Sequence, residues 1–98
     1  MNKYFRLVDA SNTHNSALIT LRELGFELEI VPPSLESEEE TEIGMGFWRA
    51  RTEGREFEAS DPLTLLGLVA IWRHRGDDWA RDEDPDIYDE LLEDAYPD

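Results

Sequence analysis

The stretch DPLTLLGLVAIWRHRG, residues 61–76, decides the fold because it predicts one complete helix with both ends marked. Asp61 is a favourable N-cap, and Pro62 stands at the first helical position, where its missing N–H costs no hydrogen bond. Three basic residues near the C-terminal end complement the helix dipole, and Gly76 favours a left-handed stop. The side chains between these ends leave almost no polar face, so we expect the helix to be largely buried.

The chain before this helix begins with KYFRLV, residues 3–8, which predicts a strand. Phe5 and Leu7 lie on one side of it, and the other side also carries apolar residues, which favours the interior of a sheet. A helix is expected over about residues 13–24, capped by one of the polar residues at positions 11–13. Gly25 ends that helix and lets the chain fold back.

Three further strands are expected before the buried helix. Residues 26–31, FELEIV, alternate between apolar and acidic residues, as a half-buried strand does. Residues 34–42 follow as an acidic loop, which we expect to be mobile because it has little to bury. Residues 43–51 and 55–59 then predict a hairpin, closed by a tight turn at Gly54.

The hairpin carries a small basic island. Arg49, Arg51 and Arg55 lie beside Trp48, and either an anionic ligand or a cation–π contact would use them. We favour internal pairing with the glutamates of the same hairpin, at positions 53, 56 and 58, because opposite charges on adjacent strands meet easily.

A last helix is expected over about residues 85–95, opened by the pair Asp84-Pro85. Its apolar stripe consists of Ile87, Tyr88, Leu91, Leu92 and Ala95. The predicted order is therefore β-α-β-β-β-α-α. Such an order indicates a single α+β domain over residues 1–98, with a small, mostly antiparallel sheet and helices packed on one face. The first β-α-β unit would add a parallel pair of strands.

Composition limits the class of protein. A hydrophobic content of 40% supports one core and argues against general disorder. The chain has no cysteine, which excludes disulfides and thiolate sites and is compatible with a reducing compartment. No apolar run approaches the roughly 20 residues of a membrane span, and the N-terminus has no signal-peptide core. We therefore expect a cytoplasmic protein.

The formal charge is −15, from 24 acidic and 9 basic residues. Because affinity for phosphate comes largely from Lys and Arg, this charge disfavours direct binding to nucleic acid or to an anionic membrane. It favours solubility and steers the molecule toward a basic protein, such as a nuclease or a DNA-binding protein.

The acidic residues gather in the loop at residues 34–42 and in the helical segment at residues 77–98. On the last helix they occupy the positions that the apolar stripe leaves free, so helical spacing produces a continuous negative face. Tryptophan outside a core is enriched in interfaces, so an exposed Trp would serve as an anchor. The residues expected to bind a partner are Glu38, Glu39, Glu40, Trp79, Asp86, Tyr88, Asp89, Glu90, Glu93 and Asp94.

Metal binding, cofactors and catalysis are not expected. Asp82, Asp84, Asp86 and Glu93 have the spacing of a calcium loop, but Ile87 stands where such a loop needs its turn glycine. The two histidines, at positions 14 and 74, form no metal-binding pair. No serine lies in a nucleophile-elbow pattern, and no glycine-rich phosphate loop occurs.

Two functions remain open on the sequence. The leading hypothesis is an acidic interaction module that blocks a basic partner by electrostatic occlusion, as an immunity protein, an antitoxin or a DNA mimic does. The alternative is a structural or regulatory domain that forms a homodimer through the hairpin edge or an exposed Trp, without catalysis.

Overall fold

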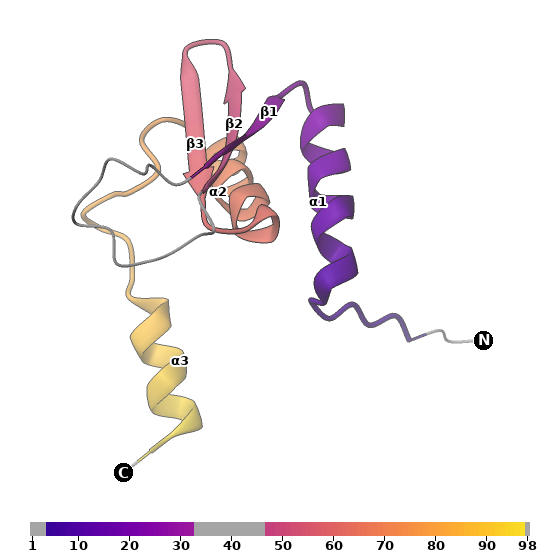
Figure 1. The fold of residues 1–98 in the computed structure, drawn as a ribbon. Coiled ribbons are helices and arrows are strands. Elements are labelled where there is room, and N and C mark those ends of the chain that lie inside the picture. Colours follow the sequence, from indigo (N-terminus) through magenta and orange to yellow (C-terminus); the bar gives the residue numbers. More distant parts are fainter. Residues whose placement is uncertain (1–3, 33–46, 98) are drawn as a thin grey trace, which may run out of the picture.

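The computed structural model describes residues 4–32 and 47–97. The chain is an α+β fold, in which a three-stranded antiparallel sheet of order β1-β2-β3 is accompanied by three helices (Figure 1). This architecture confirms the predicted fold class. Along the chain the elements are α1 (Ser11–Glu23), β1 (Glu27–Val31), β2 (Phe47–Thr52), β3 (Arg55–Ala59), α2 (Pro62–Arg75) and α3 (Ile87–Ala95).

The predicted hairpin forms between β2 and β3, where Thr52 pairs with Arg55 across a two-residue turn. Gly54 adopts a φ of 69°, the left-handed conformation for which glycine is favoured. Strand β1 pairs with β2 on the other side, with Leu28 opposite Ala50. Positions 43–46 of the predicted strand lie outside the described residues.

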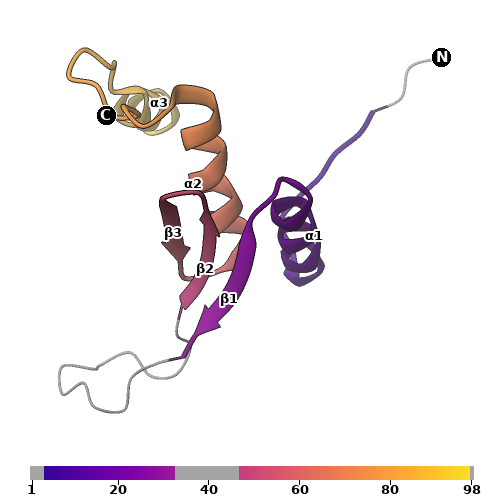
Figure 2. The same ribbon diagram turned by 90° about the horizontal axis from the view of Figure 1, so that it is seen from above.

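Helices α1 and α2 lie on the same side of the sheet and pack against each other, as Figure 2 shows. The core lies between these helices and the sheet. It is small, because few side chains in the described ranges are buried together. They are Leu21, Phe26, Ala50, Ala59, Leu65 and Val69. Both helices and all three strands contribute to this core or pack directly against it.

An aromatic cluster closes one end of the core. The rings of Phe26 and Phe57 meet edge to face at 5.9 Å, and the ring of Trp72 lies 5.6 Å from that of Phe57. Trp72 and Trp48 are both half-buried against the core. Trp72 therefore packs at the edge of the core and contributes contact area without being enclosed.

The ends of α2 are as predicted, whereas its burial is not. Asp61 is the N-cap and accepts a hydrogen bond from the Thr64 main-chain N–H at 2.9 Å, and Gly76 ends the helix at a φ of 89°. The helix is not largely buried, because Leu68 and Ile71 remain 36% and 44% exposed. A sheet of three strands covers only one stripe of an all-apolar helix.

Helix α1 begins at Ser11, slightly earlier than predicted, and Gly25 with a φ of 99° follows its end. The chain then turns back so that the Phe26 main-chain N–H donates to the Leu21 carbonyl oxygen at 3.1 Å. Phe26 is thereby buried, at 4% exposure, as the fold-back after Gly25 predicts.

The prediction of a strand at the N-terminus is wrong for the described part of that segment. Residues 4–10 form no helix or strand, and Tyr4, Phe5 and Leu7 are 88%, 82% and 73% exposed. The segment leaves the start of α1 in a direction away from the sheet, in both Figure 1 and Figure 2. A strand needs a neighbouring main chain to pair with, so the predicted parallel β-α-β pair does not form.

Helix α3 also stands apart from the body, below the sheet in Figure 1. It has no buried residue, so it does not pack on the sheet as the other two helices do. The radius of gyration is 17.1 Å, compared with about 13 Å for a compact domain of this length. Both the N-terminal segment and α3 project from the core and contribute to this excess.

Candidate interaction surface

Helix α3 and its N-cap carry six of the ten residues that the sequence assigned to partner binding. It begins at Ile87, and its N-cap is Asp86, whose carboxylate accepts a hydrogen bond from the Asp89 main-chain N–H at 3.1 Å. The expectation that Asp84-Pro85 opens this helix is wrong. The reason is that the Asp84 side chain is bonded to Arg75 and Arg81 instead of to the first turn of α3.

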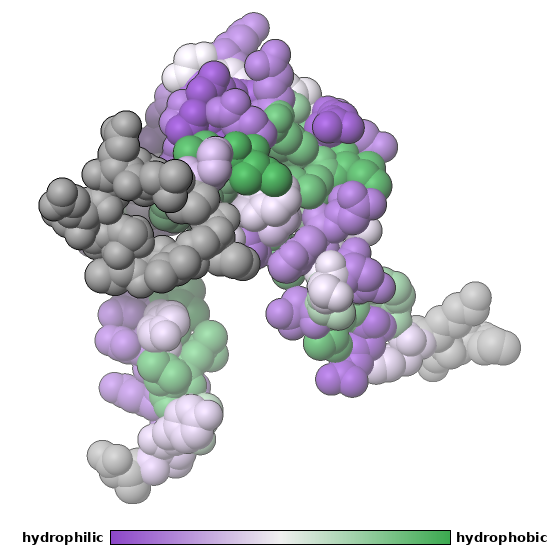
Figure 3. All heavy atoms as spheres, viewed as in Figure 1, coloured by the Kyte–Doolittle hydropathy of each residue, from purple (hydrophilic) through white to green (hydrophobic). Residues whose placement is uncertain are grey.

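The apolar stripe of α3 is exposed to solvent. Ile87, Tyr88 and Leu91 are 53%, 77% and 60% exposed, and Leu92 and the following Tyr96 are also open. In Figure 3 hydrophobic residues appear in green on the surface of the helix at the lower left, beside paler and purple residues. An apolar side chain gains free energy only when it leaves water, so this stripe is an unused contact surface.

The remaining surface of α3 is uniformly acidic. Between positions 82 and 97 the chain has eight acidic residues and no basic one. Within the described ranges, the ion pairs do not include any carboxylate from the helix or its N-cap. These unpaired carboxylates are Asp86, Asp89, Glu90, Glu93 and Asp94, all five of which the sequence assigned to the partner surface.

The link from α2 to α3 is held by an ion-pair clasp, defined here as Arg75, Arg81 and Asp84. The guanidinium of Arg75 donates two hydrogen bonds to the Asp84 carboxylate, at 2.7 and 2.8 Å. The Arg81 side chain donates to the Arg75 carbonyl oxygen at 3.0 Å, and its main-chain N–H donates to Asp84 at 3.1 Å. The Arg75 guanidinium and then the Arg81 N–H lower the pKa of Asp84 to about 2.

A second contact fixes the start of this link. Arg55 donates to both oxygens of Asp77, at 2.8 and 2.7 Å, and the indole N–H of Trp72 donates to Asp77 at 2.7 Å. The Arg55 guanidinium also lies over the Trp72 ring, 5.1 Å from its centroid. The hydrogen bonds from Arg55 and then Trp72 lower the pKa of Asp77 to about 2. Asp77 and Asp84 are therefore occupied in holding the link.

Trp79 is 55% exposed and belongs to a different surface from α3. It lines a groove of about 380 Å³ between β3 and α2, together with Phe57, Leu68 and Ile71. The sequence assigned Trp79 and Tyr88 to one partner surface, whereas the structure puts Trp79 in the groove and Tyr88 on the projecting helix.

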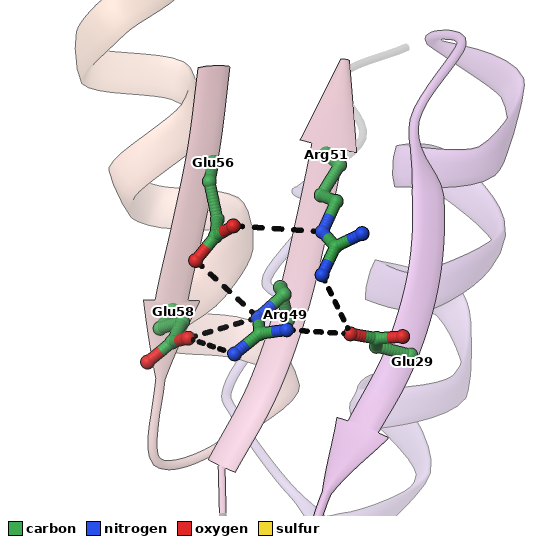
Figure 4. Close-up of polar contacts among 5 residues, drawn as sticks. All are labelled: Glu29, Arg49, Arg51, Glu56 and Glu58. Carbon is green, nitrogen blue, oxygen red and sulfur yellow. Dashed lines mark hydrogen bonds and ion pairs between the residues drawn. The ribbon is translucent and has the colours of Figure 1, made fainter. Parts of the chain in front are cut away.

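The outer face of the sheet is charged but internally paired, as Figure 4 shows. Arg49 lies 2.7 Å from both Glu29 and Glu58, and Arg51 lies 3.2 Å from Glu29 and 3.5 Å from Glu56. The expected pairing across the hairpin is therefore confirmed for Glu56 and Glu58, and it extends to β1. This face has few free carboxylates to offer a partner.

The third arginine of the hairpin, Arg55, has other partners than expected. Arg55 does not meet the side chain of Glu53. It reaches instead the Glu53 carbonyl oxygen, at 3.2 Å, and the carboxylate of Asp77. The cation–π alternative weighed for this island is realised by Arg55, although over Trp72 and not over Trp48.

The acidic loop is the remaining part of the predicted site. Glu38, Glu39 and Glu40 lie outside the described residues, and so does the whole of the loop at residues 34–42. In the part of the chain that the structure describes, no group of three or more His, Asp or Glu side chains is arranged to hold a metal ion. The calcium spacing is interrupted because Asp84 is bonded to Arg75.

Sequence reasoning missed two exposed surfaces. It placed residues 3–8 inside the sheet and α2 inside the core, so Phe5, Leu7, Leu68 and Ile71 were expected to be buried. The sequence did contain a signal for this exposure, because it has more apolar side chains than a small sheet can bury. Three short strands cannot cover an all-apolar helix and an apolar N-terminal segment at once.

Comparison with protein-family models, with curated proteins and with solved structures finds no match to this chain. None of the helices described is long and apolar enough to cross a membrane. The function must therefore be inferred from the residues of the chain itself.

Proposed function

We propose that this protein is a small acidic interaction module that binds a basic protein through α3 and inhibits it by occlusion. The partner is a nuclease or a DNA-binding protein, whose phosphate-binding surface the acidic helix would cover. The module itself would perform no catalysis. A cytoplasmic location, expected from the cysteine-free sequence, suits such a partner.

One observation supports this proposal above the others. Helix α3 presents an apolar stripe with no buried residue, and carboxylates fill the positions around that stripe. A helix that serves only to make a protein soluble needs the carboxylates but not the stripe. Apolar and charged residues together on one projecting helix are the features of a helix that lies in a groove of a partner.

The length of α3 leads to the same proposal. Nine residues of which none is buried form a marginal helix in water, because few hydrogen bonds offset the cost of nucleation. The like charges three and four residues apart lower its stability further. A basic groove would remove both penalties, since it would bury the stripe and neutralise the carboxylates. Binding would therefore order the helix.

The stripe also bears on the mode of inhibition. A protein that imitates only the phosphates of DNA needs regularly spaced negative charge and no apolar anchor. Tyr88 and Leu91, which are 77% and 60% exposed, instead favour insertion into a cleft with apolar walls. Between the two inhibitor types, the immunity or antitoxin type is therefore the better fit.

The test is capture of partners by the immobilised chain from a bacterial lysate, with elution in steps of rising salt. We expect a basic protein that elutes at moderate salt, because screening weakens charge contacts. The purified partner should then protect the α3 amides from hydrogen exchange. The double variant Glu90→Gln with Glu93→Gln should lose the partner at lower salt, and Leu91→Ser should reduce binding at every salt concentration.

The matched control is Glu23→Gln with Glu27→Gln, which removes the same charge from exposed positions on α1 and β1. It should bind as the unaltered chain does. The proposal fails if the control and the α3 variant weaken binding equally, because net charge and not α3 would then be responsible. It also fails if no basic protein is captured.

A further inference from the structure

In the part of the chain that the structure describes, one edge of strand β3 is unpaired, and an apolar groove lies beside it. Among residues 4–32 and 47–97, β2 is the only strand paired with β3. The groove beside this edge is lined by Leu68 and Ile71 of α2 and by Trp79, which are 36%, 44% and 55% exposed. An open strand edge beside apolar side chains is a site where an extended segment can add to a sheet.

The register shows which main-chain groups face this edge. In a two-residue hairpin the residues that flank the turn exchange hydrogen bonds, and such pairs then alternate along the ladder. Thr52 and Arg55 flank the turn here, so alternate residues of β3 bond to β2. The main-chain N–H and C=O groups of Glu56 and Glu58 therefore point toward the open edge. The side chains of both residues lie on the outer face of the sheet.

The N-terminal segment has the complementary pattern. In an extended chain, Phe5 and Leu7 point to one side, while Arg6 points to the other between Tyr4 and Val8. Pairing with β3 would place Phe5 and Leu7 in the groove. It would place Arg6 opposite Glu56 or Glu58, in a cluster where three carboxylates share only two arginines. Residues 1–8 contain two basic residues and no acidic one, whereas the rest of the chain is strongly acidic.

We propose that residues 4–8 of a second copy of this chain add to β3 as a fourth strand, so that two copies associate by exchanging their N-terminal segments. In the observed fold this segment does not reach β3 of its own chain, because it leaves α1 on the side away from β3 in both ribbon views (Figures 1 and 2). Among the described residues α3 is another exposed apolar segment, but its carboxylates would lie against those of Glu56 and Glu58.

The opposite edge of the sheet is a poorer match for the segment. The groove at β1 has a less apolar lining than the groove at β3, and it includes Arg22 and Glu23. The main-chain groups that face outward there belong to Leu28 and Ile30, by the same alternation through β2. An arginine on the outer face of a strand added there would lie opposite Glu27 or Glu29, so the two edges differ in their grooves and not in their carboxylates.

The first experiment is sedimentation of the full chain over a concentration series from roughly 5 μM to 500 μM, a range suited to an interface smaller than the standard size. The mass should rise from 11.4 kDa toward twice that value. Phe5→Ser with Leu7→Ser should weaken association at least tenfold, since both side chains would leave the groove. The matched control, Tyr88→Ser with Leu91→Ser on α3, should associate as the unaltered chain does. All four side chains are exposed in the monomer, so both double variants should keep its fold.

The second experiment uses the absence of cysteine. A chain with Arg6→Cys is mixed under oxidising conditions with a chain carrying Glu58→Cys, and a disulfide between the two chains is expected. The control mixture pairs Arg6→Cys with Glu27→Cys on the opposite edge and should give much less product. The proposal is overturned if the mass stays at that of one chain, if the α3 variant alone prevents association, or if both mixtures cross-link equally.

Salt separates this association from the binding of a basic partner. Two copies that each carry a charge of −15 repel each other, so raising the salt from roughly 20 to 200 mM should strengthen self-association. The same change should weaken the binding of a basic protein to α3. Each proposal can therefore fail without the other.

Discussion

The contrast between Leu65 and Leu91 gives a direct test of the structure. Both are leucines within helices, so replacement by alanine changes helix propensity by a similarly small amount. Leu65 is 0% exposed in the core, whereas Leu91 is 60% exposed on α3. The structure therefore predicts very different costs for the same chemical change.

The expected cost of Leu65→Ala follows from burial. Removing a fully buried leucine loses its transfer free energy and leaves a cavity, for a total of about 3 kcal/mol. A small domain has a free energy of unfolding of about 5–10 kcal/mol, so this loss is a large fraction of the total. Leu91→Ala should change the free energy of unfolding by less than about 0.5 kcal/mol, as for other exposed positions.

The assay is urea unfolding, followed by tryptophan fluorescence, which reports on Trp48 and Trp72 beside the core. With a slope of about 1 kcal/mol per molar urea, Leu65→Ala should lower the midpoint by about 3 M, or leave the chain unfolded in buffer. Leu91→Ala should leave the midpoint within about 0.5 M. Equal shifts for the two variants would show that α3 packs on the body, which would refute both the fold described here and the exposed stripe.

Three further outcomes are expected, each measured by the same unfolding assay. Asp61→Ala should lower the free energy of unfolding by about 1 kcal/mol through loss of the α2 cap, and Asp61→Asn should restore most of it. The pKa values of Asp77 and Asp84 are lowered to about 2, so the stability that these groups contribute is complete above their ordinary pKa and is lost as the pH falls from about 4 toward 2. Replacing both by Asn should make the urea midpoint nearly independent of pH over that range. If the midpoint of the variant still fell with pH as steeply as that of the unaltered chain, the role given to these contacts would be contradicted. Arg49→Met should destabilise the chain more than Arg51→Met, because Arg49 contacts three carboxylates, and the difference should shrink in about 1 M salt.

The features that the sequence predicted correctly are those set by neighbouring residues. The caps of α2 at Asp61 and Gly76 depend on the conformations of single residues, and so do the turn at Gly54 and the reversal after Gly25. The class of fold follows from the order of such local elements. Periodicity also identified α3, although its first residue was misplaced because the clasp takes Asp84.

The features that the sequence did not predict depend on whether the rest of the chain provides a surface for a segment to pack against. Residues 3–8 have the alternation of a strand, and α3 has the apolar stripe of a packed helix. Neither pattern indicates which part of the protein, if any, covers the apolar face. The body of the chain has too little sheet to cover both. The same limit explains why Leu68 and Ile71 of α2 remain exposed. In the candidate site, the sequence identified the acidic helix and could not separate Trp79 from it.

The clasp of Arg75, Arg81 and Asp84 has a consequence for how tightly the proposed partner would bind to α3. It ties the link to the end of α2, so only Pro85 and Asp86 separate the clasp from the first residue of the helix. Such a short and partly rigid joint restricts the directions in which the helix can point before any encounter. A partner then has less orientational freedom to remove than it would with a long flexible tether. Cutting the clasp, for example by Asp84→Asn, should leave every contacting side chain in place and still slow the capture of a partner.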